Sequence, residues 1–181
     1  MKIRRVVTGH DAQGRSVFVD DGDAPRAHSF AHIPGHAFAQ VWQTAPAAGV
    51  PHAGGDLTAA RGSLLPAPGA SSLLVVDFQP DAVMASPDMD FAAAGAEMGA
   101  MLPGLIDVFE QDSPGMHTTD TIDYGFVLDG EIWLELDNGA QRLLKAGDIV
   151  VQNGTRHAWR NKTDKPVRVA FVMMGAARRG G

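Results

Sequence analysis

The chain contains no cysteine, and this absence excludes disulfide bonds, thiolate metal sites and cysteine nucleophiles. Positive charge is also scarce: 15 Lys and Arg stand against 21 Asp and Glu, a formal charge of -6, which argues against a nucleic-acid partner. No apolar run approaches the roughly 20 residues that span a bilayer, and the start of the chain lacks the apolar stretch of a signal peptide. We therefore expect a soluble protein with no nucleic-acid or membrane partner, compatible with a cytoplasmic, reducing compartment.

Two motifs of nucleotide and acyl-transfer chemistry are missing as well. The glycines of residues 49–55 are not followed by Lys-Ser or Lys-Thr, so the sequence has no phosphate-binding loop of the usual kind. No Gly-x-Ser-x-Gly sequence occurs, which removes the nucleophile elbow of serine hydrolases. We therefore expect no nucleotide cofactor.

The C-terminal half carries a clear strand pattern. In residues 131–136, Ile and Leu alternate with Glu and Trp at a period of two, which is typical of a half-buried strand. The pattern breaks at dipeptides that favour tight turns, such as Asp129-Gly130 and Asn138-Gly139. Short strands joined by such turns every ~8 to 12 residues indicate an antiparallel sandwich or barrel. The expected strands are residues 72–78, 124–128, 131–136, 141–144, 149–151, 157–161 and 167–173.

The N-terminal half has less periodicity. Residues 4–7 and 16–19 predict an outer hairpin, whereas residues 45–70, rich in Ala, Gly and Pro, predict an irregular loop that wraps the domain. Residues 91–101 favour a short helix, and residues 105–110 resume strand character. We expect one structural domain of the all-β class, organised as an N-terminal β extension (residues 1–70), a barrel (residues 71–175) and a tail (residues 176–181).

Polar residues of one parity cluster around the strand that begins near residue 121. An unbroken strand would point four side chains to one face, namely His117, Thr119, Thr121 and Asp123. If that face is interior, these groups must be paired, because burying them without partners costs on the order of several kcal/mol. His157 follows three hairpin connections later, far enough for an adjacent strand to return it to the same place. Two imidazoles and a carboxylate are a usual donor set for Fe(II), Zn or Mn, and a hydrogen-bonded polar network is the alternative.

Two segments resemble the sequence motifs of the cupin superfamily. The first motif usually reads Gly, five residues, His-x-His, three or four residues, Glu, six residues, Gly. The second reads Gly, five residues, Pro-x-Gly, two residues, His, three residues, Asn, and its glycine interval is one residue shorter here. The matching positions are His117, Asp123 and Gly130 for the first motif, and Gly147, Gly154, His157 and Asn161 for the second. The resemblance covers residues 105–174, and it departs from the family where Thr119 replaces the second histidine and Asp123 replaces glutamate.

The resemblance implies a double-stranded β-helix, a small jelly-roll barrel with a pocket at its mouth. In similar proteins the motif histidines and the acid hold Fe, Mn, Zn or Ni, which would make His117, Asp123 and His157 the ligands and Thr119 a non-ligand. Because Asp is one methylene shorter than Glu, Asp123 has the alternative of holding an imidazole ring as an outer partner of the metal. Metal-free members also exist. Similar proteins dimerise through their sheets, so we expect a homodimer with the hairpin of residues 4–19 at the contact.

Several further side chains are candidates for contact with a small-molecule ligand. Asp123 is the candidate general base if it does not bind metal, and Tyr124 offers the only phenolic hydroxyl in the chain. Alternation places Tyr124 on the opposite face from Asp123, however, which favours core packing. The candidate substrate-binding residues are Thr119, Thr121, Trp159 and Trp42. Their structural alternatives are ordinary strand positions for the threonines, barrel filling for Trp159 and a loop anchor for Trp42.

Three further histidines, His28, His32 and His36, recur every four residues, which on a helix would align their rings. Pro34-Gly35 interrupts such a helix, so we interpret them as exposed loop histidines.

The sequence as a whole predicts a small metal-dependent enzyme that acts on a compact organic acid, carbonyl or aromatic compound. The ion would be a Lewis acid that polarises an oxygen of the substrate. Isomerisation, decarboxylation, dehydration and dioxygenation are all compatible, because one fold supports many chemistries. The alternative is a metal-free binding or sensing module, in which the same polar groups recognise a ligand inside an apolar barrel.

Overall fold

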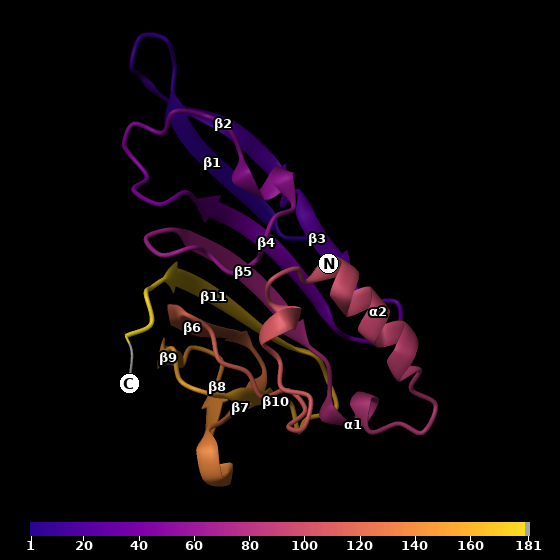
Figure 1. Ribbon diagram of the computed structural model, residues 1–181. Helices are drawn as coiled ribbons and strands as arrows, with labels where there is room; N and C mark the ends of the chain where they lie inside the picture. Colours follow the sequence, from indigo (N-terminus) through magenta and orange to yellow (C-terminus); the bar gives the residue numbers. More distant parts are fainter. Residues whose placement is uncertain (180–181) are drawn as a thin grey trace.

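Two antiparallel sheets and a separate hairpin of β1 and β2 make up the computed structural model, which describes residues 1–179 (Figure 1). The large sheet has the strand order β3-β4-β5-β11-β6-β9, and the small sheet has the order β10-β7-β8. This arrangement confirms the all-β class and the double-stranded β-helix that the sequence predicted. The strands are β1 (Arg4–His10), β2 (Ser16–Asp23), β3 (Arg26–Ser29), β4 (Ala37–Thr44), β5 (Ser71–Phe78), β6 (Thr121–Asp129), β7 (Glu131–Glu135), β8 (Gln141–Lys145), β9 (Ile149–Asn153), β10 (Ala158–Arg160) and β11 (Val167–Gly175).

Two helices connect β5 to β6, and the second of them covers the inner face of the large sheet. They are α1 (Asp81–Met84) and α2 (Phe91–Met101), and α2 has the bounds that the sequence predicted. Ala94 of α2 packs in one buried cluster with Phe38 of β4 and Leu74 of β5. A second cluster joins the two sheets and contains Val127, Ile132, Val167 and Val169. Among residues 1–179, no helix is long and apolar enough to cross a membrane.

Strand β6 follows the alternation predicted for it. Thr121 and Asp123 are 3% and 5% exposed, whereas Ile122 and Tyr124 are 39% and 41% exposed. The strand turns into β7 at Gly130, where φ is +76° and a Cβ atom would lie 3.0 Å from the Val167 side chain. Glycine is therefore required there by both backbone conformation and space. The inward parity of β6 thus brings its polar residues to the interior.

Residues 105–110 do not form the predicted strand. Ile106–Val108 is a single 3-10 turn, and within the segment only Phe109 makes a β-bridge, to His117. The apolar side chains of this segment serve packing: Leu105 and Ile106 contact the main core cluster. A short apolar run does not distinguish a buried strand from a packed turn, which is why the sequence pattern was wrong here.

The N-terminal segment contributes more to the fold than the predicted hairpin. The hairpin itself forms, with β1 and β2 paired antiparallel. In addition, β3 pairs with β4, and β4 pairs antiparallel with β5, so both strands extend the large sheet. The sequence prediction had no strand there, because β4 does not alternate regularly between apolar and polar side chains.

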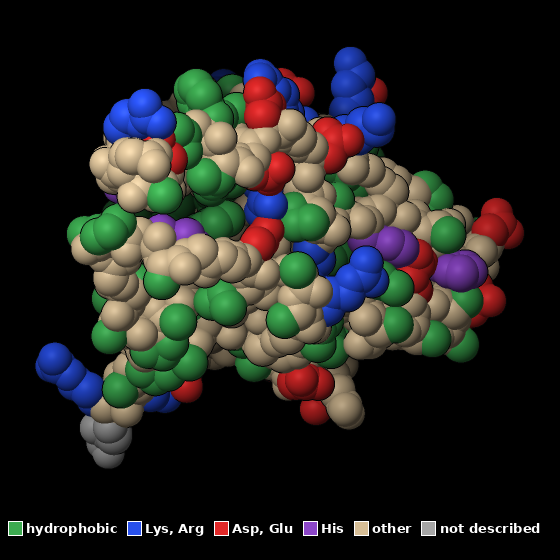
Figure 2. Space-filling model, turned by 90° about the horizontal axis from the view of Figure 1, so that it is seen from above, with side chains coloured by type: hydrophobic (Ala, Val, Ile, Leu, Met, Phe, Trp, Pro, Cys, Tyr) green, Lys and Arg blue, Asp and Glu red, His purple; other side chains and the backbone are tan. Residues whose placement is uncertain are grey.

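Arginines of the hairpin lie beside carboxylates. Arg4 bonds to Asp21 at 2.7 Å, and Arg5 reaches both Asp20 and Asp56, at 2.9 and 2.5 Å. Figure 2 shows basic and acidic side chains interspersed with hydrophobic ones on the face seen there. Arg5 therefore ties the hairpin to the loop that precedes β5.

Candidate functional site

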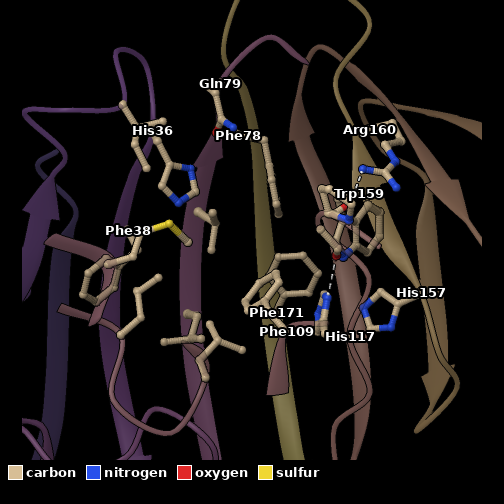
Figure 3. A pocket seen from close by; sticks show the side chains of 18 of the residues that line it. His36, Phe38, Phe78, Gln79, Phe109, His117, His157, Trp159, Arg160 and Phe171 are labelled. Carbon is tan, nitrogen blue, oxygen red and sulfur yellow. Dashed lines mark hydrogen bonds between the residues drawn. The ribbon is translucent and has the colours of Figure 1, made fainter. Parts of the chain in front are cut away.

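A cavity of about 500 Å³ lies against the inner face of the large sheet (Figure 3). Its lining is mainly apolar and comes from β4, β5, β6, β10, β11 and α2, with rings supplied by Phe38, Phe78, Phe109, Trp159 and Phe171. The polar side chains that line it are His36, Gln79, Asp81, His117, Thr119, Asp123, His157 and Arg160. A largely apolar cavity with a few convergent polar groups is the usual form of a small-molecule site.

His117 and His157 lie side by side, as the sequence predicted, with their rings tilted by 50° to each other. The backbone of each residue bonds to the other, from His117 N to His157 O at 2.9 Å and from His157 N to His117 O at 3.0 Å. Residues directly opposite in an antiparallel pair send their side chains to the same side. The two ring centroids are consequently only 4.2 Å apart, although the residues are far apart in the sequence.

The backbone also determines which nitrogen of each ring carries the proton. The Nδ1 atom of His117 lies 3.0 Å from the Gly115 carbonyl, and Nδ1 of His157 lies 2.9 Å from the Thr155 carbonyl. A carbonyl oxygen only accepts, so Nδ1 must donate in both rings. In the neutral rings each Nε2 then has a free lone pair, which requires a donor or a cation as its partner.

Burial keeps both imidazoles neutral. Desolvation lowers the pKa of His117, and the Gly115 carbonyl opposes it. Desolvation, followed by the nearby His117, lowers the pKa of His157 to about 4. A neutral imidazole is the form that binds metal ions and accepts protons.

Asp123 lines the same cavity and carries an unpartnered oxygen. Its Oδ1 is buried without a hydrogen-bond partner among the described residues. Burial raises the pKa of Asp123 to about 6, and the Thr121 hydroxyl opposes this shift. A carboxyl group that titrates near neutral pH can both release and take up a proton, which suits general acid-base chemistry.

The donor atoms fit a metal ion only in part. In both His117 and His157 the backbone carbonyl holds the proton on Nδ1 and leaves the lone pair on Nε2. An imidazole nitrogen in this state has the chemistry of a metal ligand. Across residues 1–179, however, no three His, Asp or Glu side chains are close enough together to hold an ion. Asp123 therefore lines the cavity without completing a three-residue centre, and the ligand set stays a prediction.

Two of the four predicted substrate-binding residues line the cavity. Thr119 is 2% exposed, and Trp159 packs edge-on against Phe171 with ring centroids 5.4 Å apart. Thr121 lies behind Thr119 and donates a 2.7 Å hydrogen bond to its hydroxyl oxygen. Thr121 thus orients Thr119 and is not itself a lining residue.

Tyr124 and Trp42 lie outside the cavity, which corrects two site predictions. Tyr124 is on the face of β6 opposite to Asp123, as alternation predicted, but it is 41% exposed, so the core packing expected for it is wrong. Trp42 is turned outward by a bulge in β4, where the register shifts between Gln40 and Trp42. Its ring instead contacts Arg5, whose guanidinium carbon lies 5.5 Å from the ring centroid.

The three early histidines are not simply exposed loop residues. His28 Nε2 and His32 Nδ1 lie 2.7 and 3.0 Å from the carboxylate of Glu97 on α2. Burial raises the pKa of Glu97, but backbone N–H groups of Ala31 and His32, together with the two rings, lower it to about 2. His36 faces the cavity instead. The position of His36 in the cavity could have been predicted only by predicting β4, the strand that begins at the next residue.

Comparisons with known proteins agree on one family. The model of the cupin domain family matches residues 105–173. The cupin-domain-containing oxidoreductase fogC of Aspergillus ruber is 32% identical over 178 residues, which cover 96% of this chain and 72% of that protein. Phomopsin biosynthesis cluster protein D of Diaporthe leptostromiformis is 48% identical over 84 residues. That match covers 43% of this chain and less than half, 44%, of the relative.

The solved structures that align with this chain have low sequence identity to it. KdgF from Halomonas sp. aligns with a TM-score of 0.40 and 15% identity, covering 81% of this chain and 83% of that one. A Cupin 2 conserved barrel domain protein from Salinispora arenicola aligns with a TM-score of 0.35 and 18% identity, covering 59% and 64%.

Proposed function

The chain belongs to the cupin superfamily, and from this premise we propose that it is an enzyme whose cavity binds a small, largely apolar organic molecule. The substrate is an aromatic or similarly flat compound with a carbonyl or hydroxyl oxygen. That oxygen lies at His117 and His157, and Asp123 transfers a proton. The observation that carries the proposal is the position of Asp123: a buried carboxyl of raised pKa, whose Oδ1 has no partner among the described residues, in the same apolar cavity as two free imidazole lone pairs.

The lining supports the substrate class. Rings of Phe78, Trp159 and Phe171 pack against one another at centroid distances of 5.4 to 6.2 Å, and all three line the cavity. Such a surface favours a flat apolar body over a strongly hydrated one, because burying charged groups without partners is costly. The substrate's polar atoms then find partners only at a few points of the wall.

The polar end supports proton transfer. His117 and His157 accept hydrogen bonds or bind a cation through Nε2, and Thr119 offers a hydroxyl oriented by Thr121. Asp123 takes a proton from a carbon or oxygen of the substrate when ionised and returns it when protonated. Because the surroundings are apolar, an ionic transition state interacts more strongly with these groups than it would in water.

A divalent ion would be held by His117 and His157. When bound, such an ion supplies Lewis-acid polarisation of the substrate oxygen. The names of the relatives, a cupin-domain-containing oxidoreductase and proteins of the phomopsin biosynthesis cluster, support an enzyme of small-molecule biosynthesis. The metal-free binding module stays the second candidate, because no three His, Asp or Glu side chains gather within residues 1–179.

Metal uptake distinguishes the two candidates. Untagged protein is incubated with Fe, Mn, Ni or Zn, desalted and measured by elemental analysis, together with His117→Ala and His157→Ala. We expect close to one ion per chain, and at least a tenfold loss in each variant, because each removes one of two ring donors. His10→Ala, at the exposed end of β1, is the matched control and retains the metal. No uptake by the parent protein would favour the binding module.

We also propose that the chain forms a homodimer, with the outer face of β6 and β9 as the contact in place of the hairpin of residues 4–19 that the sequence suggested. This face exposes Tyr124, Ile149 and Val151, at 41%, 62% and 56%. Tyr124 is paired with Val151, so the exposed residues adjoin across the two strands. Contiguous apolar surface of this kind is uncommon on a monomer, and a second copy would cover it.

Charge introduced into this face is expected to separate the subunits. In sedimentation equilibrium, the parent protein should have the mass of two chains and Val151→Glu the mass of one, because an unpaired carboxylate would be buried at the contact. Phe91→Glu changes an exposed aromatic residue on α2 and should leave the dimer intact. A parent protein with the mass of one chain would contradict the proposal.

A further inference from the structure

The ring of His117 depends on a tight turn directly before it. Residues 113–116 form a β-turn, which is closed by a 2.9 Å hydrogen bond from Met116 N to Ser113 O. Proline stands at the second position of the turn and glycine at the third, and φ of Gly115 is +82°. This is the type II pattern, in which the third residue needs a positive φ. The Gly115 carbonyl that holds the proton of His117 on Nδ1 is therefore part of the turn.

One peptide group distinguishes the two common types of such a turn. Between type I and type II the peptide that joins the second and third residues reverses its direction, because ψ of the second residue and φ of the third both change. The carbonyl of this peptide is that of Pro114, and it accepts a 2.8 Å hydrogen bond from Nη1 of Arg160. Figure 3 marks the hydrogen bonds of Arg160 and of the His117 ring with dashed lines. Arg160 thus holds the turn in the type II form.

Arg160 is itself held by the small sheet. It belongs to β10, where it pairs with Trp133 of β7, and its Nε donates to Glu135 of β7 at 2.5 Å. A Cβ atom at Gly115 would lie 3.0 Å from Nη1 of Arg160, so the guanidinium lies directly against the turn. The fork of donors lets one guanidinium hold a carboxylate and a carbonyl at once. Arg160 therefore connects the small sheet to the turn that precedes His117.

We propose that Arg160 is a positioning residue for His117. By holding the Pro114 carbonyl, it keeps the Gly115 carbonyl directed at Nδ1 of His117, and so leaves the lone pair of this ring on Nε2. The inference deepens the proposed function, on which its use rests: the ring meets a substrate hydroxyl or a metal ion as an acceptor and not as a donor. The role acts through the backbone, and Arg160 needs no contact with the substrate for it.

The tautomer of each ring is a direct readout of this role. Long-range proton–nitrogen NMR correlation shows which ring nitrogen carries the proton, in histidine-labelled protein free of metal and ligand at pH 8, where imidazoles are neutral. Arg160→Met keeps the apolar stem and should lower the ratio of the Nδ1–H to the Nε2–H tautomer at His117 about fivefold, the factor that one hydrogen bond represents. His157 should not change, because the Thr155 carbonyl holds its Nδ1 independently of the turn.

Two further variants separate positioning from a general loss of stability. Arg168→Met removes another arginine that binds a carboxylate, that of Asp77 at 2.7 Å, but Arg168 does not line the cavity, so both tautomers should stay as in the parent protein. Gly115→Ala places a Cβ atom at positive φ and against Nη1 of Arg160. It should shift the His117 tautomer in the same direction without removing the guanidinium. Circular dichroism and the thermal midpoint verify that each variant is folded.

Two results would overturn the positioning role. If the His117 tautomer is unchanged in folded Arg160→Met, the turn holds the Gly115 carbonyl alone. If the tautomers of His117 and His157 change together, the effect is not local. Should Arg160→Met fail to fold, Gly115→Ala decides by the same two criteria. Failure of the proposed function has a different signature: the tautomers respond as expected, yet the parent protein takes up no metal and binds no aromatic carbonyl compound, with 2-naphthaldehyde as the probe.

Discussion

Replacement of Asp123 by asparagine is expected to raise the free energy of unfolding of the metal-free protein by about 2 to 3 kcal/mol at pH 7.5, and to change it little near pH 3.5. The side chain is 5% exposed, and burial raises its pKa from 3.8 to about 6. A difference of about two units between folded and unfolded states corresponds to about 3 kcal/mol. Asparagine has nearly the same shape but does not ionise.

The sign follows from proton binding. Between pH 4 and 6 the folded protein holds a proton at Asp123 that the unfolded chain has lost, so stability decreases as pH rises through this window. Above pH 6 both states are ionised, and the full cost remains. In the Asp123→Asn variant this loss should be absent, so the two stability curves meet at low pH, diverge between about pH 4 and 6, and stay a constant distance apart at higher pH.

Urea unfolding at a series of pH values measures this difference. The protein is first treated with a chelator, because a bound cation would stabilise the carboxylate. Asp112→Asn, on an exposed loop, removes the same charge at the surface and is expected to change stability by less than about 0.5 kcal/mol. If Asp123→Asn is less stable than the parent at pH 7.5, the carboxylate has a favourable partner in solution and the proposed free base is wrong. A gain in stability on removal of a buried charge is expected at sites kept for function.

The barrel could be predicted because its local signals agree with one another. The alternation in β6 and β7 and the turn at Gly130 specify both the strands and the face that is buried. Helix α2 was predictable for the same reason, since its composition and Pro103-Gly104 mark its end. The strand expected over residues 105–110 failed because an apolar run reports burial and not conformation.

The candidate site was predictable only where parity or a motif determined it. The inward position of Asp123 follows from alternation, and the meeting of His117 with His157 follows from the motif spacing. Trp42 was misplaced because the direction of its side chain depends on β4, a strand that the sequence prediction lacked, and on the bulge within that strand. His36 was missed because its place in the cavity depends on the pairing of β4 with β5, a long-range contact without local periodicity.

The second large effect is expected at Asn161, whose side chain connects the cavity wall to a turn. It is 1% exposed, and its Nδ2 donates to the Phe78 and Lys165 carbonyls at 2.9 and 2.7 Å. Its Oδ1 accepts from the backbone N–H and the hydroxyl of Thr163 at 3.0 and 2.7 Å. The amide therefore satisfies four polar groups at once, and it fixes the end of β5, from which Phe78 and Gln79 line the cavity.

Asn161→Ala is expected to lower the free energy of unfolding by about 3 to 4 kcal/mol, because it removes four hydrogen bonds and leaves buried backbone groups without partners. Asn161→Asp should be at least as destabilising at neutral pH, since it keeps the acceptor but places a second oxygen against the Phe78 and Lys165 carbonyls. The matched control is Asn153→Ala on the exposed side of β9, with a change below about 1 kcal/mol. Urea unfolding with an unchanged m-value measures each difference. A loss of less than 1 kcal/mol for Asn161→Ala would mean that water replaces the amide, and that Phe78 and Gln79 are positioned by β5 alone.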